Sequence, residues 1–148
     1  MLLPLNEKQF EFWTMRRSGV PNITIATRLG ISRQAVSRAL LAMDEKVEST
    51  LREMANANQI AIDTINSERG ILLGKSIPFS TAAIIFVSAK HGVQVWYEHD
   101  GDCSNCQRYT ECIELLWDYA DELNIKIKKT ADPTKMAEEL FAKAKELA

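Results

Sequence analysis

The chain has 148 residues, 46% of them hydrophobic, which is enough for the core of one ordinary domain or of two small ones. Its start, MLLPLNEK, lacks a basic stretch followed by a long apolar one, and no window approaches the roughly eighteen apolar residues of a membrane span. We therefore expect a soluble, cytoplasmic protein with no membrane partner.

The net charge of -2 is unevenly distributed along the chain. Residues 1–43 carry six Lys and Arg against two Glu, a local balance of +4, so the remainder stands at -6. A basic end on an acidic body is expected of a protein that touches nucleic-acid phosphates with one end only.

The first predicted element is a helix over Glu7–Arg17. Asn6 and Gln9 have capping-box spacing ahead of its apolar residues. Arg16 and Arg17 fall in its last turn, where they could reach phosphates or simply favour the helix dipole.

The stretch Pro21–Leu41 is expected to form two short helices joined by a tight turn. Gly30 stands where the turn needs a positive φ, and Ser32 has the side chain of an N-cap for the second helix. The apolar positions that let the helices cross are Ile25, Leu29, Ile31, Val36, and Ala39 or Leu40.

The second of these helices leaves polar side chains on one face at its start. Such side chains reach base edges and phosphates when a helix enters the major groove. The candidate DNA-binding residues are Ser32, Arg33, Gln34, Ser37, Arg38, Arg28 and Arg17.

This pattern closely resembles the DNA-binding helix-turn-helix, particularly that of sigma-factor region 4, LuxR-type response regulators and archaeal Tfx-like regulators. The resemblance covers roughly Leu5 to Glu48, about a third of the chain. It implies a three-helix domain over residues 1–43 with double-stranded DNA as its partner. A hairpin used only for packing is the alternative, but it has no reason to leave two arginines, a glutamine and two serines exposed at one helix start.

The second helix has no obvious end, because neither glycine nor proline occurs from Ser32 to Glu68. A heptad-like apolar seam runs along it: Val36, Leu40, Met43, Val47, Leu51 and Met54. We therefore predict a connecting and dimerisation helix over residues 44–69, with a homodimer that places two recognition helices in successive major grooves. Burial of the seam against the C-terminal half of the same subunit is the alternative.

Residues 70–148 are expected to form a C-terminal domain. Residues 82–88 and 93–98 have the composition of two antiparallel strands around a short loop, in which His91 should be solvated. Helices are predicted over residues 110–123 and from Pro133 onward, whereas Ile71 to Leu73 fit helix or strand equally. The fold class expected is mainly α with a small β-hairpin (α+β).

All three cysteines of the chain, Cys103, Cys106 and Cys112, lie within ten residues of one another, with His99 just before them. In a reducing cytoplasm such clustering indicates metal binding rather than disulfides. The sequence therefore predicts a metal site in the C-terminal domain.

The C-x2-C-x5-C spacing resembles the ligand run of several iron-sulfur proteins, including WhiB-like regulators, fumarate-and-nitrate-reduction regulators and cluster-stapled nucleases. The resemblance implies a [4Fe-4S] or [3Fe-4S] cluster. Those families have a fourth cysteine elsewhere, and this chain has none, so one iron is open or the fourth ligand is His99, Asp100, Asp102 or His91. Zinc is the alternative, because Cys103, Cys106, Cys112 and His99 make a complete Cys3His set.

No phosphate loop, catalytic-metal histidine set or nucleophile–base pair stands out, so we do not expect an enzyme. The function predicted is a sequence-specific transcriptional regulator in which an iron-sulfur cluster senses redox state or a small ligand. The alternative is a DNA-binding protein with structural zinc, whose C-terminal half is a protein-interaction or ligand-binding module.

Overall fold

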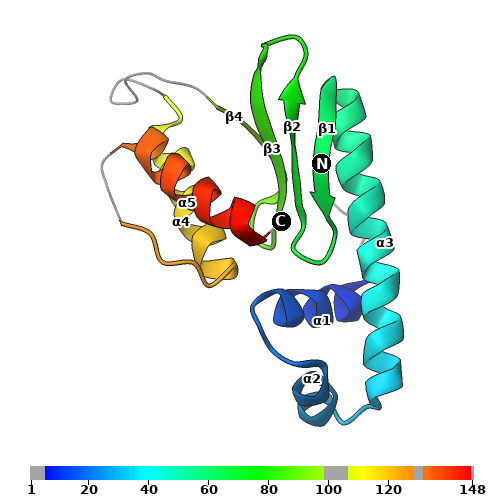
Figure 1. Ribbon diagram of the computed structural model, residues 1–148. Helices are drawn as coiled ribbons and strands as arrows, with labels where there is room; N and C mark the ends of the chain where they lie inside the picture. Colours follow the sequence, from blue (N-terminus) through cyan, green and yellow to red (C-terminus); the bar gives the residue numbers. More distant parts are fainter. Residues whose placement is uncertain (1–5, 99–106, 129–131, 148) are drawn as a thin grey trace.

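The computed structural model describes residues 6–98, 107–128 and 132–147. Over these residues the chain forms five helices and one four-stranded sheet (Figure 1). In chain order the elements are α1 (Glu7–Arg17), α2 (Asn22–Leu29), α3 (Arg33–Ala57), β1 (Ile60–Asn66), β2 (Ile71–Ser76), β3 (Thr81–Ser88), β4 (Gly92–Tyr97), α4 (Tyr109–Glu122) and α5 (Pro133–Leu147). None of the described helices is long and apolar enough to cross a membrane.

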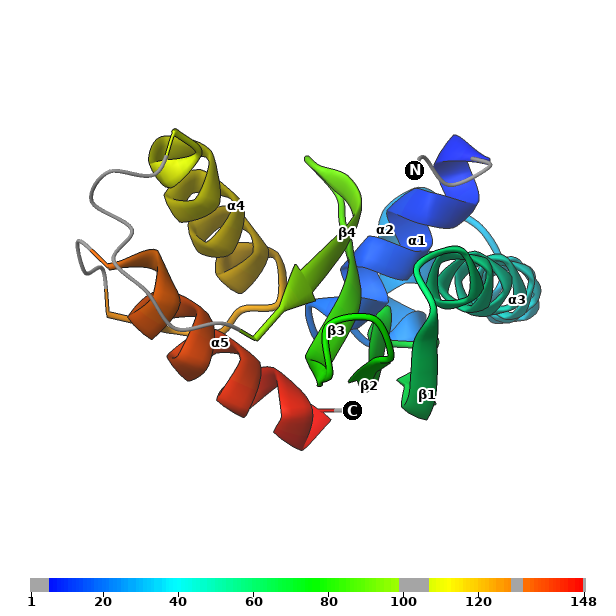
Figure 2. The same ribbon diagram turned by 90° about the horizontal axis from the view of Figure 1, so that it is seen from above.

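The α+β class is confirmed, and the sheet lies between two helical layers (Figure 2). Its strands follow the order β1-β2-β3-β4, and each neighbouring pair is antiparallel. The α1 and α3 helices cover one face, while α4 and α5 cover the other. The expected hairpin is present as β3 and β4, but it is half of a larger sheet.

The prediction of one helix through residue 68 is wrong. The helix ends at Ala57, Gln59 takes a positive φ of 54°, and Ile60–Asn66 runs back along β2 as a strand. The isoleucines of this segment favour a pleated, half-buried surface, which the pairing with β2 provides. The connecting segment expected at 44–69 is therefore part helix and part edge strand, and the undecided residues 71–73 belong to β2.

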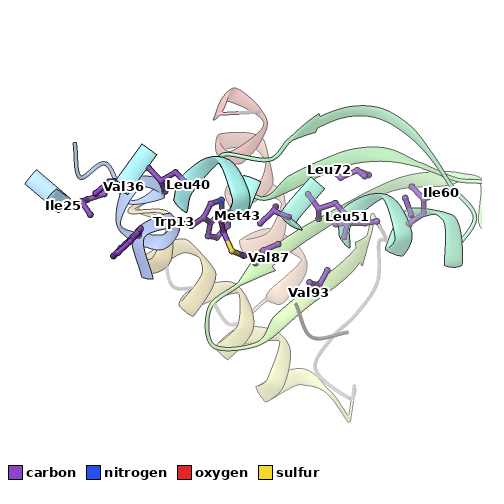
Figure 3. Packing of buried hydrophobic residues seen from close by; sticks show 14 of the residues in the cluster. Trp13, Ile25, Val36, Leu40, Met43, Leu51, Ile60, Leu72, Val87 and Val93 are labelled. Atoms are coloured by element: carbon purple, nitrogen blue, oxygen red, sulfur yellow. The ribbon is translucent and has the colours of Figure 1, made fainter. Parts of the chain in front are cut away.

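The apolar seam of α3 packs inside its own chain. Val36, Leu40, Met43, Val47 and Leu51 are at most 2% exposed, and they share one core with residues of the sheet (Figure 3). The seam is therefore not a dimer interface, and burial within the subunit is the correct alternative. The physical reason is that β1 and β2, absent from the expected fold, enlarge the apolar sheet face that a long helix can cover.

The β3 strand is apolar on both faces. Ile85 and Val87 point into the core under α3, whereas Ile84 and Phe86 point into a second core under α4 and α5. A strand covered on both sides reads as a continuous apolar run, which explains why alternation is absent from this segment.

The helices of the expected DNA-binding domain pack directly against the sheet. The indole N–H of Trp13 donates to the carbonyl of Ser67 at 3.1 Å, and the same ring lies against Gly70 in the β1–β2 turn. A Cβ added at Gly70 would stand 2.7 Å from the Trp13 ring, so only glycine permits this close approach. The three N-terminal helices and the sheet thus share one continuous core.

Candidate nucleic-acid interface and cysteine site

The turn between α2 and α3 has the local geometry predicted for it. Gly30 takes φ 65° and ψ 33°, and the N–H of Ile31 donates to the carbonyl of Ala26 at 3.1 Å. The Ser32 hydroxyl then accepts from the N–H of Ala35 at 3.1 Å, which caps α3. Because Ile25 and Ala26 are buried beneath the turn, the start of α3 is held in a defined direction.

The first two turns of α3 present the polar side chains to solvent. Ser32, Arg33, Gln34, Ser37 and Arg38 are all exposed. The last four of them line an open surface hollow together with Pro21, Asn22 and Ile23 of the α2 start. The structure thus brings the residues predicted on α3 onto one continuous surface.

The arginines of this region are not neutralised within the described residues. Arg28, Arg33 and Arg38 form no salt bridge there, whereas Arg52, farther along α3, pairs with Glu48 at 3.1 Å. Cations without a protein partner remain available to phosphates and to base edges.

Arg17 does not belong to this surface. It is 2% exposed, lies over the Trp13 ring at 4.5 Å, and donates a hydrogen bond to the Val87 carbonyl. The prediction that Arg17 contacts DNA is therefore wrong for this conformation, because packing of α1 against the sheet directs the guanidinium inward. Arg16 also has a partner within the protein, because its guanidinium forms a bidentate ion pair with Asp44 of α3.

Arg17 sits instead in a buried polar junction between α1, β3 and α4. The Glu122 carboxylate at the end of α4 lies 3.8 Å from its guanidinium and accepts hydrogen bonds from the Ser88 hydroxyl at 3.2 Å and the Lys90 N–H at 3.0 Å. Burial lowers the pKa of Arg17 and raises that of neighbouring Tyr119. Sequence reasoning missed the junction, since residues about a hundred positions apart give no local signal.

Three buried atoms of this junction have no hydrogen-bond partner among the described residues: Arg17 Nε, the Tyr119 hydroxyl and Glu122 Oε2. An unsatisfied buried polar atom costs roughly 1 to 3 kcal/mol.

Of the predicted metal ligands, only Cys112 lies in the described part of the chain; His99, Cys103 and Cys106 fall outside it. Cys112 is in the first turn of α4 and half-buried. It lines a surface pocket of about 310 Å³ that also includes His91. Within the described ranges, no three His, Cys, Asp or Glu side chains gather as a metal site would require.

From its place in a loop, His91 is expected to be solvated, but in the structure its side chain contacts α4. Its Nε2 lies 2.9 Å from Asp118 Oδ2 on α4, and this hydrogen bond, followed by the charge of Lys90, lowers the pKa of the Asp118 carboxyl. The β3–β4 loop is thereby attached to the same helix that begins near Cys112.

Comparisons with protein-family models, with curated proteins and with solved structures found no match for this chain.

Proposed function

We propose that this protein is a sequence-specific transcriptional regulator that binds double-stranded DNA through the start of α3. The observation that carries the proposal is the exposed start of that helix, capped by Ser32, where two arginines without a salt bridge among the described residues share one surface with a glutamine and a serine. The side chains are of the types that read base edges, with arginine matched to guanine and glutamine to adenine.

The position of this surface supports the proposal. The α2 helix and the start of α3 lie at one end of the molecule, and the β2–β3 turn lies at the other (Figure 1). DNA bound at the α2 end would stay away from the acidic C-terminal half, which limits charge repulsion. Affinity should fall as the salt concentration rises, with a modest slope set by the few arginines at that end.

Fluorescence anisotropy with a selected operator fragment tests this function. Replacing Arg33, Gln34 and Arg38 together with alanine should abolish preference for the operator over scrambled DNA, because the base-reading groups are gone. The matched control is Arg52→Ala, which removes an exposed arginine from the same helix outside the proposed surface. Equal operator binding by the triple variant and the control would exclude this surface.

We further propose that the cysteine run of the C-terminal half holds an iron-sulfur cluster that makes DNA binding responsive to redox state or a small ligand. Such a cluster would supply a centre whose charge and ligation change with oxidants or with a bound small molecule. The residues for it are Cys103, Cys106 and Cys112, with His99 as a fourth donor, and the clustering of all three cysteines of the chain within ten residues supports this assignment.

The contacts of α4 offer a route from the cysteine run to the DNA-binding helices. The helix begins near Cys112, holds the β3–β4 loop through Asp118, and ends at Glu122 beside Arg17 of α1. A shift of α4 would change the Arg17 junction and, through α1, the direction of α3.

Structural zinc is the second candidate, favoured by the complete Cys3His donor set of His99 and the three cysteines. Anaerobic purification followed by iron, sulfide and zinc analysis separates the two. A brown protein containing iron and sulfide supports the cluster, whereas a colourless protein with one zinc per chain excludes it and leaves the C-terminal half as an interaction or ligand-binding module.

A further inference from the structure

A cavity of about 350 Å³ lies between α5 and the sheet, and none of the described residues that line it belongs to the proposed DNA-binding surface. Its apolar lining is Ile84 of β3, Trp96 of β4 and Phe141 of α5, and the two rings lie 5.9 Å apart at 45°. Alanines at positions 82, 137 and 142 complete the apolar lining, and Thr134 adds a polar side chain. Short side chains opposite two aromatic rings leave space that longer ones would fill.

Charged side chains surround this apolar space. Glu98 follows β4, while Glu138 and Lys145 come from α5, and all three are exposed. None of them forms a salt bridge within the described residues, although Lys143 and Glu139 of the same helix pair at 3.9 Å. Among the described residues that line the cavity, two carboxylates stand against one ammonium, which leaves an excess negative charge there.

We propose that this cavity binds a small aromatic compound that carries one positive charge, such as an arylalkylamine. Its volume falls at the lower end of the range of about 300 to 1,000 Å³ usual for small-molecule sites. The two rings can stack on an aromatic group and attract a cation by its charge, and the excess carboxylate favours a cation over an anion. The binding site does not depend on DNA binding or on a metal.

The cavity connects to the core that holds α4. Phe141 packs against Phe86 with ring centroids 5.5 Å apart, and Phe86 in turn packs against Tyr119 of α4 at 4.2 Å. A ligand that displaces the Phe141 ring would therefore act on the helix that carries Glu122.

Isothermal titration of the full chain, without DNA, tests the site with two probes that share one ring. Phenethylamine is the cation and 3-phenylpropionate the anion. Because an exposed ion pair contributes up to about 1 kcal/mol, two carboxylates should favour the amine over the acid by about tenfold. The double variant Glu98→Gln and Glu138→Gln should remove most of this preference. Failure of the amine to bind, or tighter binding of the acid, would overturn the proposal.

Filling the cavity gives an independent arm of the test. Ala142 is an exposed position of α5, so Ala142→Trp should fold while placing a ring in the cavity, and amine binding should fall at least about tenfold. Ala142→Ser is the matched control, because it leaves the space open and should bind as the wild type does. Unchanged binding by the Ala142→Trp variant, with a native circular dichroism spectrum, would show that the amine binds elsewhere.

Discussion

Replacing Arg17 with methionine should destabilise the protein strongly. The variant keeps an unbranched apolar chain on Trp13 but removes the hydrogen bond to Val87 and the charge beside Glu122. Breaking a buried ion pair costs about 3 to 5 kcal/mol, much of it from the charge left behind. Glu122 keeps its two hydrogen bonds and is 13% exposed, so we expect a destabilisation at the lower end of this range, about 3 kcal/mol.

A double-mutant cycle measures the coupling free energy between Arg17 and Glu122. Glu122→Gln retains an oxygen that can accept from Ser88 and Lys90, but it leaves the buried Arg17 guanidinium without its counter-charge, so it should cost about 2 kcal/mol. In the double variant no unpaired buried charge remains, and the combined loss should fall short of the sum by about 1 to 2 kcal/mol. Urea unfolding followed by circular dichroism measures all four proteins.

Arg16→Met is the control for this cycle. The side chains of Arg16 and its partner Asp44 are 20% and 17% exposed, so the free energy of unfolding should fall by about 1 kcal/mol or less. Additivity of the Arg17 and Glu122 variants within about 0.5 kcal/mol would refute the coupling between α1 and α4. If the coupling holds, Glu122→Gln, the milder variant, should also reduce the difference in operator affinity between metal-loaded and metal-free protein.

Four further outcomes are expected. Gly70→Ala should lower the free energy of unfolding by about 2 to 4 kcal/mol in urea titrations, since the new Cβ meets the Trp13 ring at a φ of +71°. Gly19→Ala, at φ +103° with nothing within 4 Å, carries the backbone strain alone and should cost clearly less; equal losses would contradict the steric explanation. Arg38→Ala should weaken operator binding by about 1 to 3 kcal/mol with a changed base preference if it reads a guanine, whereas a uniform loss with a shallower salt slope would make it a phosphate contact. Removal of the metal by chelation should change operator affinity at fixed salt, and equal affinities would contradict the sensor proposal. Because α3 buries its seam internally, Leu51→Ala should lower the free energy of unfolding by about 2 to 5 kcal/mol in urea titrations, while analytical ultracentrifugation should give the same number of subunits per operator as for the wild type.

Local sequence was sufficient to predict the N-terminal helices and the exposed face of α3. Asn6 caps α1 by accepting from the N–H of Gln9, Gly30 takes the left-handed conformation, and Ser32 caps α3, as predicted. These features depend on residues at most four positions apart, whose chemistry is visible in the sequence. The outward position of Arg33 and Arg38 follows from the helical period once the start of α3 is known.

Tertiary structure decided which partner each surface meets. The apolar seam of α3 predicts a second subunit, with the same chain as the alternative, and the four-stranded sheet, whose first strand lies in the segment predicted as helix, buries it internally. Arg17 looked like Arg28 or Arg38 in the sequence, yet the packing of Trp13 on Gly70 turns α1 so that Arg17 faces Glu122. Helical periodicity shows that a residue lies on a face, but pairings between distant segments determine what that face contacts.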